Sequence, residues 1–139
     1  MKSPMIRNTG QFEHLRVYRM SEQLADLIWE IVGEWDAFAK GTLGRQIVRS
    51  ADSIGANIAE GTGRGSYQDN RRFVRNARGS LKETKHWLRR SFRRRLLTRR
   101  QIESLKPLIE LLDPSLNAYL RSIGTSASPR ADDQGSSDE

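Results

Sequence analysis

The sequence contains no cysteine, which excludes disulfide bonds, thiolate nucleophiles and cysteine-ligated zinc sites. It has only two histidines, His14 and His86, and neither stands in a spacing typical of metal binding or acid–base catalysis. No apolar run approaches the roughly 20 residues that span a bilayer, and the N-terminus lacks the apolar stretch of a secretory signal. We therefore expect a cytoplasmic, non-enzymatic protein that uses no metal and no cofactor.

Two further patterns resemble catalytic motifs only superficially. Glu22, Asp26 and Glu30 are spaced by four residues, but the Glu-x-x-His partners of a di-metal bundle site are missing, so we interpret them as a solvated acidic face. The glycine-rich segment at residues 61–65 follows a helical pattern rather than a strand and lacks the Gly-Lys-Ser/Thr ending of a phosphate loop. It is more typical of a helix end followed by a turn.

Positive charge is abundant and concentrated in one segment. The 139 residues include 24 Lys and Arg against 17 Asp and Glu, a formal net charge of +7. Residues 12–36 carry a net charge of −4, whereas residues 71–100 hold thirteen basic residues and one acidic residue, Glu83. Residues 124–139 carry −3. The charges are therefore segregated along the chain, and a polyanionic partner is a reasonable hypothesis.

The spacing of apolar residues predicts helices throughout, because steps of three and four dominate and sustained alternation is missing. The first helix is expected over about 12–34 and the second over about 43–60, joined by a glycine-containing turn at residues 40–44. We expect Trp35 and Phe38 to anchor this connection on the core. The apolar stripes of the two helices are Val17, Met20, Leu24, Leu27/Ile28 and Ile31, and then Leu43, Ile47, Ala51, Ile54 and Ile58.

The third and fourth helices carry capping signals at their starts. Ser66 with Asp69 predicts the start of a helix of about 28 residues, and Thr98 with Gln101 predicts the next start. Pro107 and Pro114 are seven residues apart and should both face outward, bending the fourth helix without ending it. The predicted stripes are Phe73, Ala77, Leu81, Thr84, Leu88 and Phe92, and then Ile102, Leu105, Ile109, Leu112, Leu116, Tyr119 and Ile123.

Four amphipathic helices with short connections predict an all-α fold, an antiparallel up-down-up-down four-helix bundle over residues 12–123. We expect residues 1–11 to form a flexible N-terminus. Residues 124–139 are rich in Ser, Gly and Asp without periodicity, and we expect a disordered acidic C-terminal tail.

The basic residues of the third helix recur at steps of three and four, which places them on one face, with the predicted core stripe opposite. Most are arginines, whose planar guanidinium suits phosphate recognition and base stacking. The predicted nucleic-acid-binding residues are Arg71, Arg72, Arg75, Arg78, Lys82, Lys85, Arg89, Arg90, Arg93 and Arg94. Two alternatives remain open: the face could dock an acidic protein surface, or it could serve solubility alone.

Three blocks of residues carry a family resemblance. They are Phe12-Glu13-His14-Leu15-Arg16-Val17-Tyr18, Ala77-Arg78-Gly79-Ser80-Leu81, and a longer block from Leu43 that includes Gln46-Ile47-x-Arg49-Ser50-Ala51 and ends in Asn57-Ile58-Ala59-Glu60-Gly61. The sequence resembles the four-helix-bundle family named for intervening sequences in bacterial large-subunit ribosomal RNA genes. The resemblance implies a ring-like homopentamer without established enzymatic activity. It also implies kinship in fold with accessory variability proteins of diversity-generating retroelements, which associate with a reverse transcriptase and its RNA.

The sequence departs from the family pattern in the arginine-rich segment after Leu88 and in the two prolines of the last helix. The arginines favour nucleic acid, RNA above all, as the ligand. For Asn57, Glu60 and Gly61 we favour a structural role at the end of the second helix, with Gly61 supplying a positive φ. The alternative hypothesis is a protein-interaction scaffold, a ring-like homo-oligomer whose basic face docks an acidic partner.

Overall fold

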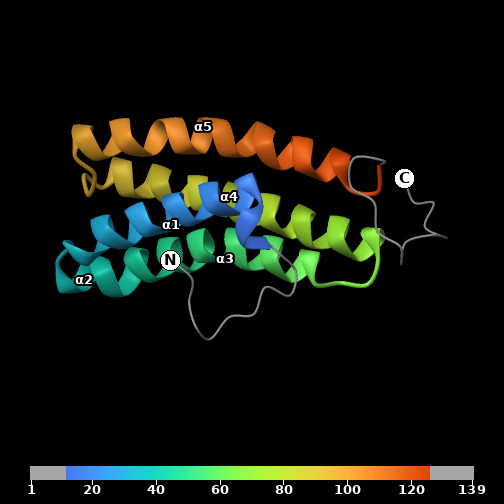
Figure 1. Cartoon of the computed structure of the whole chain (residues 1–139). Helices are drawn as coiled ribbons and strands as arrows, with labels where there is room; N and C mark the ends of the chain where they lie inside the picture. Colours follow the sequence, from blue (N-terminus) through green and yellow to red (C-terminus); the bar gives the residue numbers. More distant parts are fainter. Residues whose placement is uncertain (1–11, 126–139) are drawn as a thin grey trace.

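The computed structural model describes residues 12–125, and within them every regular element is helical, which confirms the all-α prediction (Figure 1). Residues 1–11 and 126–139, where the flexible N-terminus and most of the acidic tail were predicted, lie outside the described residues. None of the described helices is long and apolar enough to cross a membrane. The elements are η1 (Phe12–His14), α1 (Arg16–Gly33), α2 (Ala37–Ala39), η2 (Lys40–Gly44), α3 (Arg45–Thr62), α4 (Tyr67–Arg93) and α5 (Arg99–Ser122).

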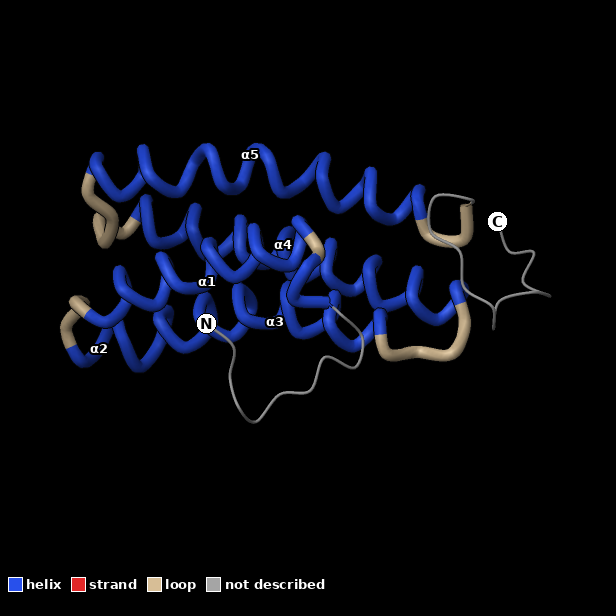
Figure 2. The backbone as a smooth tube through the Cα atoms, in the orientation of Figure 1, coloured by secondary structure: helices blue, strands red, loops and turns tan. Residues whose placement is uncertain are grey.

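The four long helices α1, α3, α4 and α5 run alternately up and down along one axis (Figures 1 and 2). Each packs against the next along the chain, and α5 packs back against α1, so the bundle is closed. The predicted four-helix bundle is therefore confirmed. Because its connections are short, the turn after α4 and the connection after α1 lie at the same end of the bundle (Figure 1).

The core is formed by the predicted stripes of α1 and α3. Leu24, Ile54 and Ile58 are completely shielded from solvent, and Ile28 and Ile47 are nearly so. An apolar stripe at steps of three and four lies on one side of a helix, so packing four such stripes together removes them all from water. This burial is the main favourable term for the fold.

The contact between α3 and α4 is unusual because small polar residues lie in it. Thr84, which is fully buried, donates to the Ser80 carbonyl oxygen at 2.8 Å, and its Oγ1 lies 3.0 Å from Ser50 Oγ. One turn away, Ser80 Oγ lies 3.0 Å from Ser53 Oγ. These hydroxyls satisfy one another, so the two helices approach closely without leaving buried polar groups unpaired.

The connection between α1 and α3 differs from the prediction. The turn expected at residues 40–44 is a π-helical segment, η2, which continues directly into α3. Asp36 begins the helical run because its carboxylate accepts a hydrogen bond from the Ala39 N–H at 2.9 Å. Trp35 is buried as expected, but the prediction for Phe38 is wrong, because its side chain is 81% exposed.

The core face of α4 agrees with the prediction at its centre and differs from it at its edges. Ala77, Leu81, Thr84 and Leu88 are buried as expected, but Phe92 is 56% exposed and Phe73 is only half-buried. Their places in the core are taken by four residues that the apolar pattern did not select. These residues are Tyr67, Asn70, Val74 and Ser91.

Helix α5 begins at the predicted capping box, in which Gln101 N–H donates to Thr98 Oγ1 and Thr98 N–H donates to the Gln101 side chain. Pro107 and Pro114 lie inside the helix and are exposed, as predicted. On the solvent side, water can replace the backbone hydrogen bonds that they remove. After the buried Ile123, Gly124 adopts a positive φ of 87°, so the first residue of the predicted tail forms an ordered turn.

Candidate nucleic-acid interface

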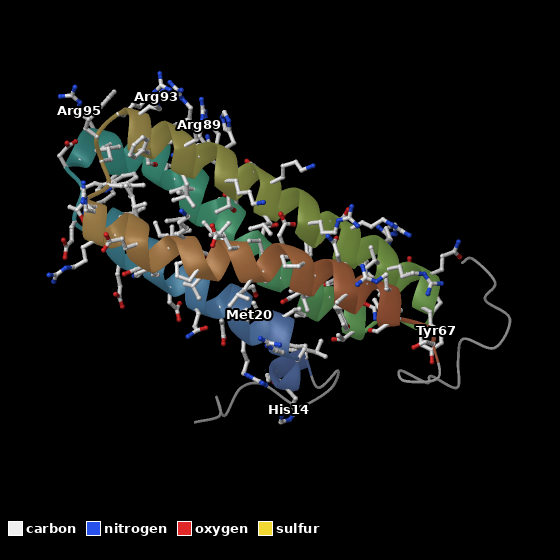
Figure 3. The ribbon with its side chains drawn as sticks, turned by 90° about the horizontal axis from the view of Figure 1, so that it is seen from above. His14, Met20, Tyr67, Arg89, Arg93 and Arg95 are labelled. Carbon is white, nitrogen blue, oxygen red and sulfur yellow. The ribbon has the colours of Figure 1, made fainter. Side chains whose placement is uncertain are left out.

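The predicted basic stripe of α4 comprises seven residues that lie along one flank of the helix and face solvent to different degrees. Figure 3 shows Arg89 and Arg93 pointing away from the bundle near the end of α4, with Arg95 just beyond them. Arg75, Arg78, Lys82, Arg89 and Arg93 are exposed, whereas Arg71 and Lys85 are half-buried. Arg72 and Arg94 of the predicted set are also exposed, and Arg90 is half-buried.

The prediction placed the stripe directly opposite the core. In the structure it lies instead on the flank of α4 that faces α5. Lys85 forms an ion pair with Asp113 of α5, and Arg71 Nη1 donates to the Ile123 carbonyl oxygen at 2.7 Å. The centre of the core face of α4 is where it was predicted, and steps of three and four from Arg71 place the stripe beside that face rather than opposite it. Two members of the predicted site therefore help to hold α5 in place.

At the start of α4, two arginines are engaged by neighbouring side chains. Arg72 pairs with Asp69 at 3.1 Å, and Arg64 pairs with Glu60 at 2.8 Å. The guanidinium carbons of both arginines lie over the Phe73 ring, 4.5 Å and 4.6 Å from its centroid. This stacking keeps Phe73 out of the core and fixes the loop at residues 63–66 against α4.

The arginines at the other end of α4 are arranged differently. Among the described residues, no carboxylate forms an ion pair with any of Arg89, Arg90, Arg93, Arg94 and Arg95, which we call the terminal arginines. Arg94 caps the C-terminus of α4, and Arg95 has a positive φ of 63°. The turn is held because Trp35 Nε1 donates to the Leu96 carbonyl oxygen at 3.0 Å. Trp35 thus attaches this turn to the end of α1.

A groove of about 380 Å³ lies beside the terminal arginines, between α4 and α5. Leu88 and Leu105 form part of its apolar lining, and Arg89 and Lys106 supply cations. Phe92, the exposed aromatic residue that was predicted to be core, also lines it. An aromatic ring next to guanidinium groups is the combination that binds unstacked bases and phosphates together.

A second basic cavity, of about 570 Å³, lies on the other flank of α4, between α4 and the start of α3. Arg45 and Arg49 from α3 line it together with Trp87 and Arg94 from α4. We call it the arginine cleft. Of these residues only Arg94 was in the predicted site. Arg45 and Arg49 were not predicted as site residues, because they lie far from the α4 stripe in the sequence.

The acidic face lies between α1 and α3. Glu22, Asp26 and Asp52 line a groove of about 290 Å³ there. Burial, followed by the charge and hydrogen bond of Glu22, raises the pKa of Tyr18 in this groove to about 12. Burial, followed by the charge of Asp26, also raises the pKa of Asp52. Negative charge therefore gathers between α1 and α3 and positive charge gathers around α4, while α3 contributes to both.

Two residues of the block that ends α3 make contacts within α3 or with the loop that follows it. Asn57 donates to the Ser53 carbonyl oxygen at 2.9 Å, and Glu60 pairs with Arg64. Gly61 has no positive φ, contrary to the prediction, because α3 continues to Thr62. The glycine is required for another reason: a Cβ at this position would lie 2.4 Å from Asn70 Oδ1.

Residues that could support metal chemistry are dispersed. His14 and His86 are both exposed, and they lie at different elements. Residues 12–125 contain no group of three or more His, Cys, Asp or Glu side chains placed to hold a metal ion. The carboxylates that do gather, Glu22, Asp26 and Asp52, border the acidic groove.

Comparison with known families agrees with the bundle and with the motif block. The family model described as 23S rRNA-intervening sequence protein matches residues 13–118, which is well over half of the chain and includes all or most of every long helix. The chain belongs to this family. The matched region ends within α5, before the last turn of the bundle. A search of curated proteins finds no match.

Proposed function

We propose that the protein is a non-enzymatic, nucleic-acid-binding bundle of the cytoplasm that contacts the phosphate backbone of RNA through the basic surface of α4. The observation that carries this proposal is the cluster of terminal arginines without carboxylate partners among residues 12–125. Guanidinium groups bind phosphate oxygens in a bidentate manner and stack on bases. The family description, which refers to ribosomal RNA, is compatible with this ligand.

Folding accounts for only part of this surface, because cations such as Arg90 and Arg93 in the last turn of a helix interact favourably with the helix dipole. Like charges spaced by four residues destabilise a helix by a few tenths of a kcal/mol per pair. Arg89 and Arg93 are spaced in this way, and Arg90 and Arg94 form a second such pair. A ligand that carries negative charge would remove this repulsion, which supports a polyanion as the natural partner.

The exposed Phe92 favours RNA with unpaired bases over duplex DNA. Its ring is 56% exposed in the groove beside Arg89. Bases in a single strand can turn outward and stack on an aromatic side chain, whereas bases in a duplex are already stacked. We therefore infer that single-stranded segments of RNA bind along the groove between α4 and α5.

Fluorescence anisotropy with a labelled single-stranded RNA, titrated with salt, tests the proposal. We expect the affinity to fall steeply with salt, with a log–log slope of about −0.7 for each phosphate contacted. The double variant Arg89→Gln/Arg93→Gln should weaken binding and make the slope shallower by about 1.4. The matched control, Arg16→Gln/Arg121→Gln, removes the same charge from exposed positions on α1 and α5 and should change both quantities much less.

Purified protein that has been freed of its own nucleic acid must be used. An affinity independent of salt, or equal losses in the two double variants, would contradict the role of the α4 surface. A duplex DNA of the same length separates the two nucleic acids, because single-stranded RNA should bind more tightly at equal salt.

The charge segregation and two exposed aromatic residues also support assembly of the chain into a homo-oligomer. Trp29 is 66% exposed and lines a largely apolar pocket of about 510 Å³ between α1 and α3, which is also lined by Arg45 and Arg49, and Phe38 is 81% exposed in the neighbouring α2. The acidic face of one subunit complements the basic face of the next, and such head-to-tail contacts close into rings when the rotation permits. The family resemblance favours five subunits.

Light scattering across micromolar concentrations tests the assembly. A single species of 15.9 kDa at low salt would contradict it.

The basic face also supports the alternative function, a scaffold that docks an acidic protein. A protein that assembles but binds no RNA would favour this alternative. The resemblance to retroelement accessory proteins further suggests a reverse transcriptase as a partner, and co-expression followed by co-purification tests this association.

A further inference from the structure

The arginine cleft is built from two segments that lie far apart in the sequence. Arg45 and Arg49 are one turn apart on α3, and Arg94 caps the C-terminus of α4. The half-buried Trp87 lines the cleft between them, and its Nε1 donates to Glu83 Oε2 at 3.1 Å. Because this hydrogen bond fixes the orientation of the indole, the ring is a preformed part of the cleft wall.

Packing does not account for the three arginines. All three side chains are exposed, and among the described residues no carboxylate forms an ion pair with any of them. Arg45 and Arg49 are like charges spaced by four residues, an arrangement that costs a helix stability. The neighbouring Ile47 and Ser50 are buried in the core, but Arg49 points to solvent. The cationic side of α3 therefore requires a reason outside the fold.

We propose that the arginine cleft binds a nucleoside phosphate, with the phosphate held by Arg45, Arg49 and Arg94 and the base against Trp87. Three guanidinium groups supply more hydrogen-bond donors than a single phosphate can accept. Because no carboxylate among the described residues forms an ion pair with them, these donors are available to a ligand. A cavity of about 570 Å³ is within the range of small-molecule sites and is larger than a phosphate ion requires. The additional space next to an indole suits a base.

This site deepens the proposed function but lies on a different surface. The basic stripe flanks α5, whereas the arginine cleft lies on the α3 side of α4, and Arg94 belongs to the end of the helix where the two surfaces meet. A nucleotide in the cleft can come from a bound RNA strand or from the free nucleotide pool. The chemistry of recognition is shared, so the experiment must separate the two sources.

Tryptophan fluorescence reads the site directly. In a Trp29→Phe background, Trp87 and the buried Trp35 are the remaining indoles, so a ligand stacked in the cleft should quench Trp87. The ligands are a 12-nucleotide oligouridine RNA, uridine 5′-monophosphate and inorganic polyphosphate. We expect the first two to quench the emission and polyphosphate, which has no base, to leave it nearly unchanged.

The charge contribution is tested in the same background. Arg45→Gln/Arg49→Gln should weaken binding of the quenching ligand by about a hundredfold, because the loss of one charged hydrogen-bond donor costs about tenfold or more and the variant removes two. The Arg16→Gln/Arg121→Gln control should have little effect. Both variants change exposed side chains, and circular dichroism should show equal helicity.

The outcomes separate this site from the proposed function. Quenching by the RNA at far lower nucleotide concentration than by uridine 5′-monophosphate identifies a strand as the source, and equal potency identifies the free nucleotide. No quenching by either ligand, equal quenching by polyphosphate, or equal losses in the two double variants would overturn the cleft. RNA binding that depends on Arg89 and Arg93 but leaves Trp87 unchanged would overturn the cleft alone, whereas quenching without salt-dependent RNA binding would overturn only the proposed function.

Discussion

Gly61 determines how closely α3 and α4 approach at the loop end of the bundle. A Cβ at this position would lie 2.4 Å from Asn70 Oδ1, 3.1 Å from Phe73 Cβ and 3.2 Å from the Asn70 carbonyl oxygen. Two of these atoms cannot rotate away, because they belong to the backbone or to the base of a side chain. The absence of a single methyl group therefore permits the contact between the helices.

Gly61→Ala should lower the free energy of unfolding by about 1–3 kcal/mol, the usual cost of adding volume to a packed contact. Gly79→Ala is the matched control within α4, since a Cβ there would meet no atom within 4 Å. That variant should raise stability by about 0.5–1 kcal/mol, because alanine favours a helix over glycine. Urea denaturation measures both changes, and equal effects at the two positions would contradict the role assigned to Gly61.

Asp52 is a carboxylate in an unfavourable environment. Burial and the charge of Asp26 raise its pKa above the ordinary value of 3.8. A raised pKa means that the folded state binds the proton more readily than the unfolded state, so ionisation of Asp52 costs stability as the pH rises through this range. This cost is present in full above the raised pKa and is absent below the ordinary value.

Asp52→Asn should therefore raise the midpoint of thermal unfolding at pH 7, and the gain should shrink as the pH falls to 3.8 and below, where the wild-type side chain is protonated in both states. Glu34→Gln, at an exposed carboxylate in the cap of α1, is the control. Thermal scans from pH 3 to pH 7 measure the difference. A gain that stays constant over this range would argue against an electrostatic cause.

Helix α5 depends on its capping box more than the other helices depend on their caps, because two prolines weaken its interior. Thr98→Ala removes the acceptor of the Gln101 N–H and should cost about 1 kcal/mol. Ser104→Ala, at an exposed position in the same helix, should leave stability unchanged or slightly higher. Denaturant midpoints measure both, and a loss at Ser104 as large as that at Thr98 would refute the capping argument.

The helices could be predicted from the sequence because three- and four-residue spacing and capping residues are local signals. The core face of α4 could not be predicted fully, because its true core includes Asn70, Thr84 and Ser91. Apolar spacing correctly predicted that Thr84 is buried. It also predicted burial of Phe73 and Phe92, whereas the fold buries other residues in their place. Hydroxyl contacts between α3 and α4 make polar positions suitable for burial, and these contacts depend on the partner helix rather than on local sequence.

The candidate site was predictable to a similar extent. The arginine stripe is periodic within one helix, so its exposed members could be located from spacing. The pairing of Lys85 with Asp113 and the cleft that joins Arg45 to Arg94 depend on how distant segments meet. Such contacts follow from the packing of whole helices, and a periodic pattern within one helix contains no information about them.

The net charge of the whole molecule gives a further prediction. Residues 126–139 contain four acidic residues and one arginine, so their removal raises the net charge from +7 by three. Ending the chain at Thr125 retains the turn at Gly124 and the bond from Arg71 to Ile123. We expect helicity and thermal stability to be nearly unchanged, while non-specific RNA binding tightens at about 50 mM salt, where screening is weak. Equal affinities of the two forms would exclude competition between these acids and phosphate.

The stacked arrangement of Arg64 and Arg72 on Phe73 gives the basic surface a polarity. At the start of α4 the cations are already engaged by Glu60, Asp69 and the aromatic ring, and in the middle Lys85 is engaged by Asp113. At the far end, about 40 Å away along a helix of 27 residues, the terminal arginines lack such partners within the described chain. Arg75, Arg78 and Lys82, which lie between, are exposed and, like the terminal arginines, form no ion pair within residues 12–125. An RNA bound as we propose would therefore be held along the middle and the far end of α4 but not at its start, so its position on the bundle would be off-centre without any reading of its sequence.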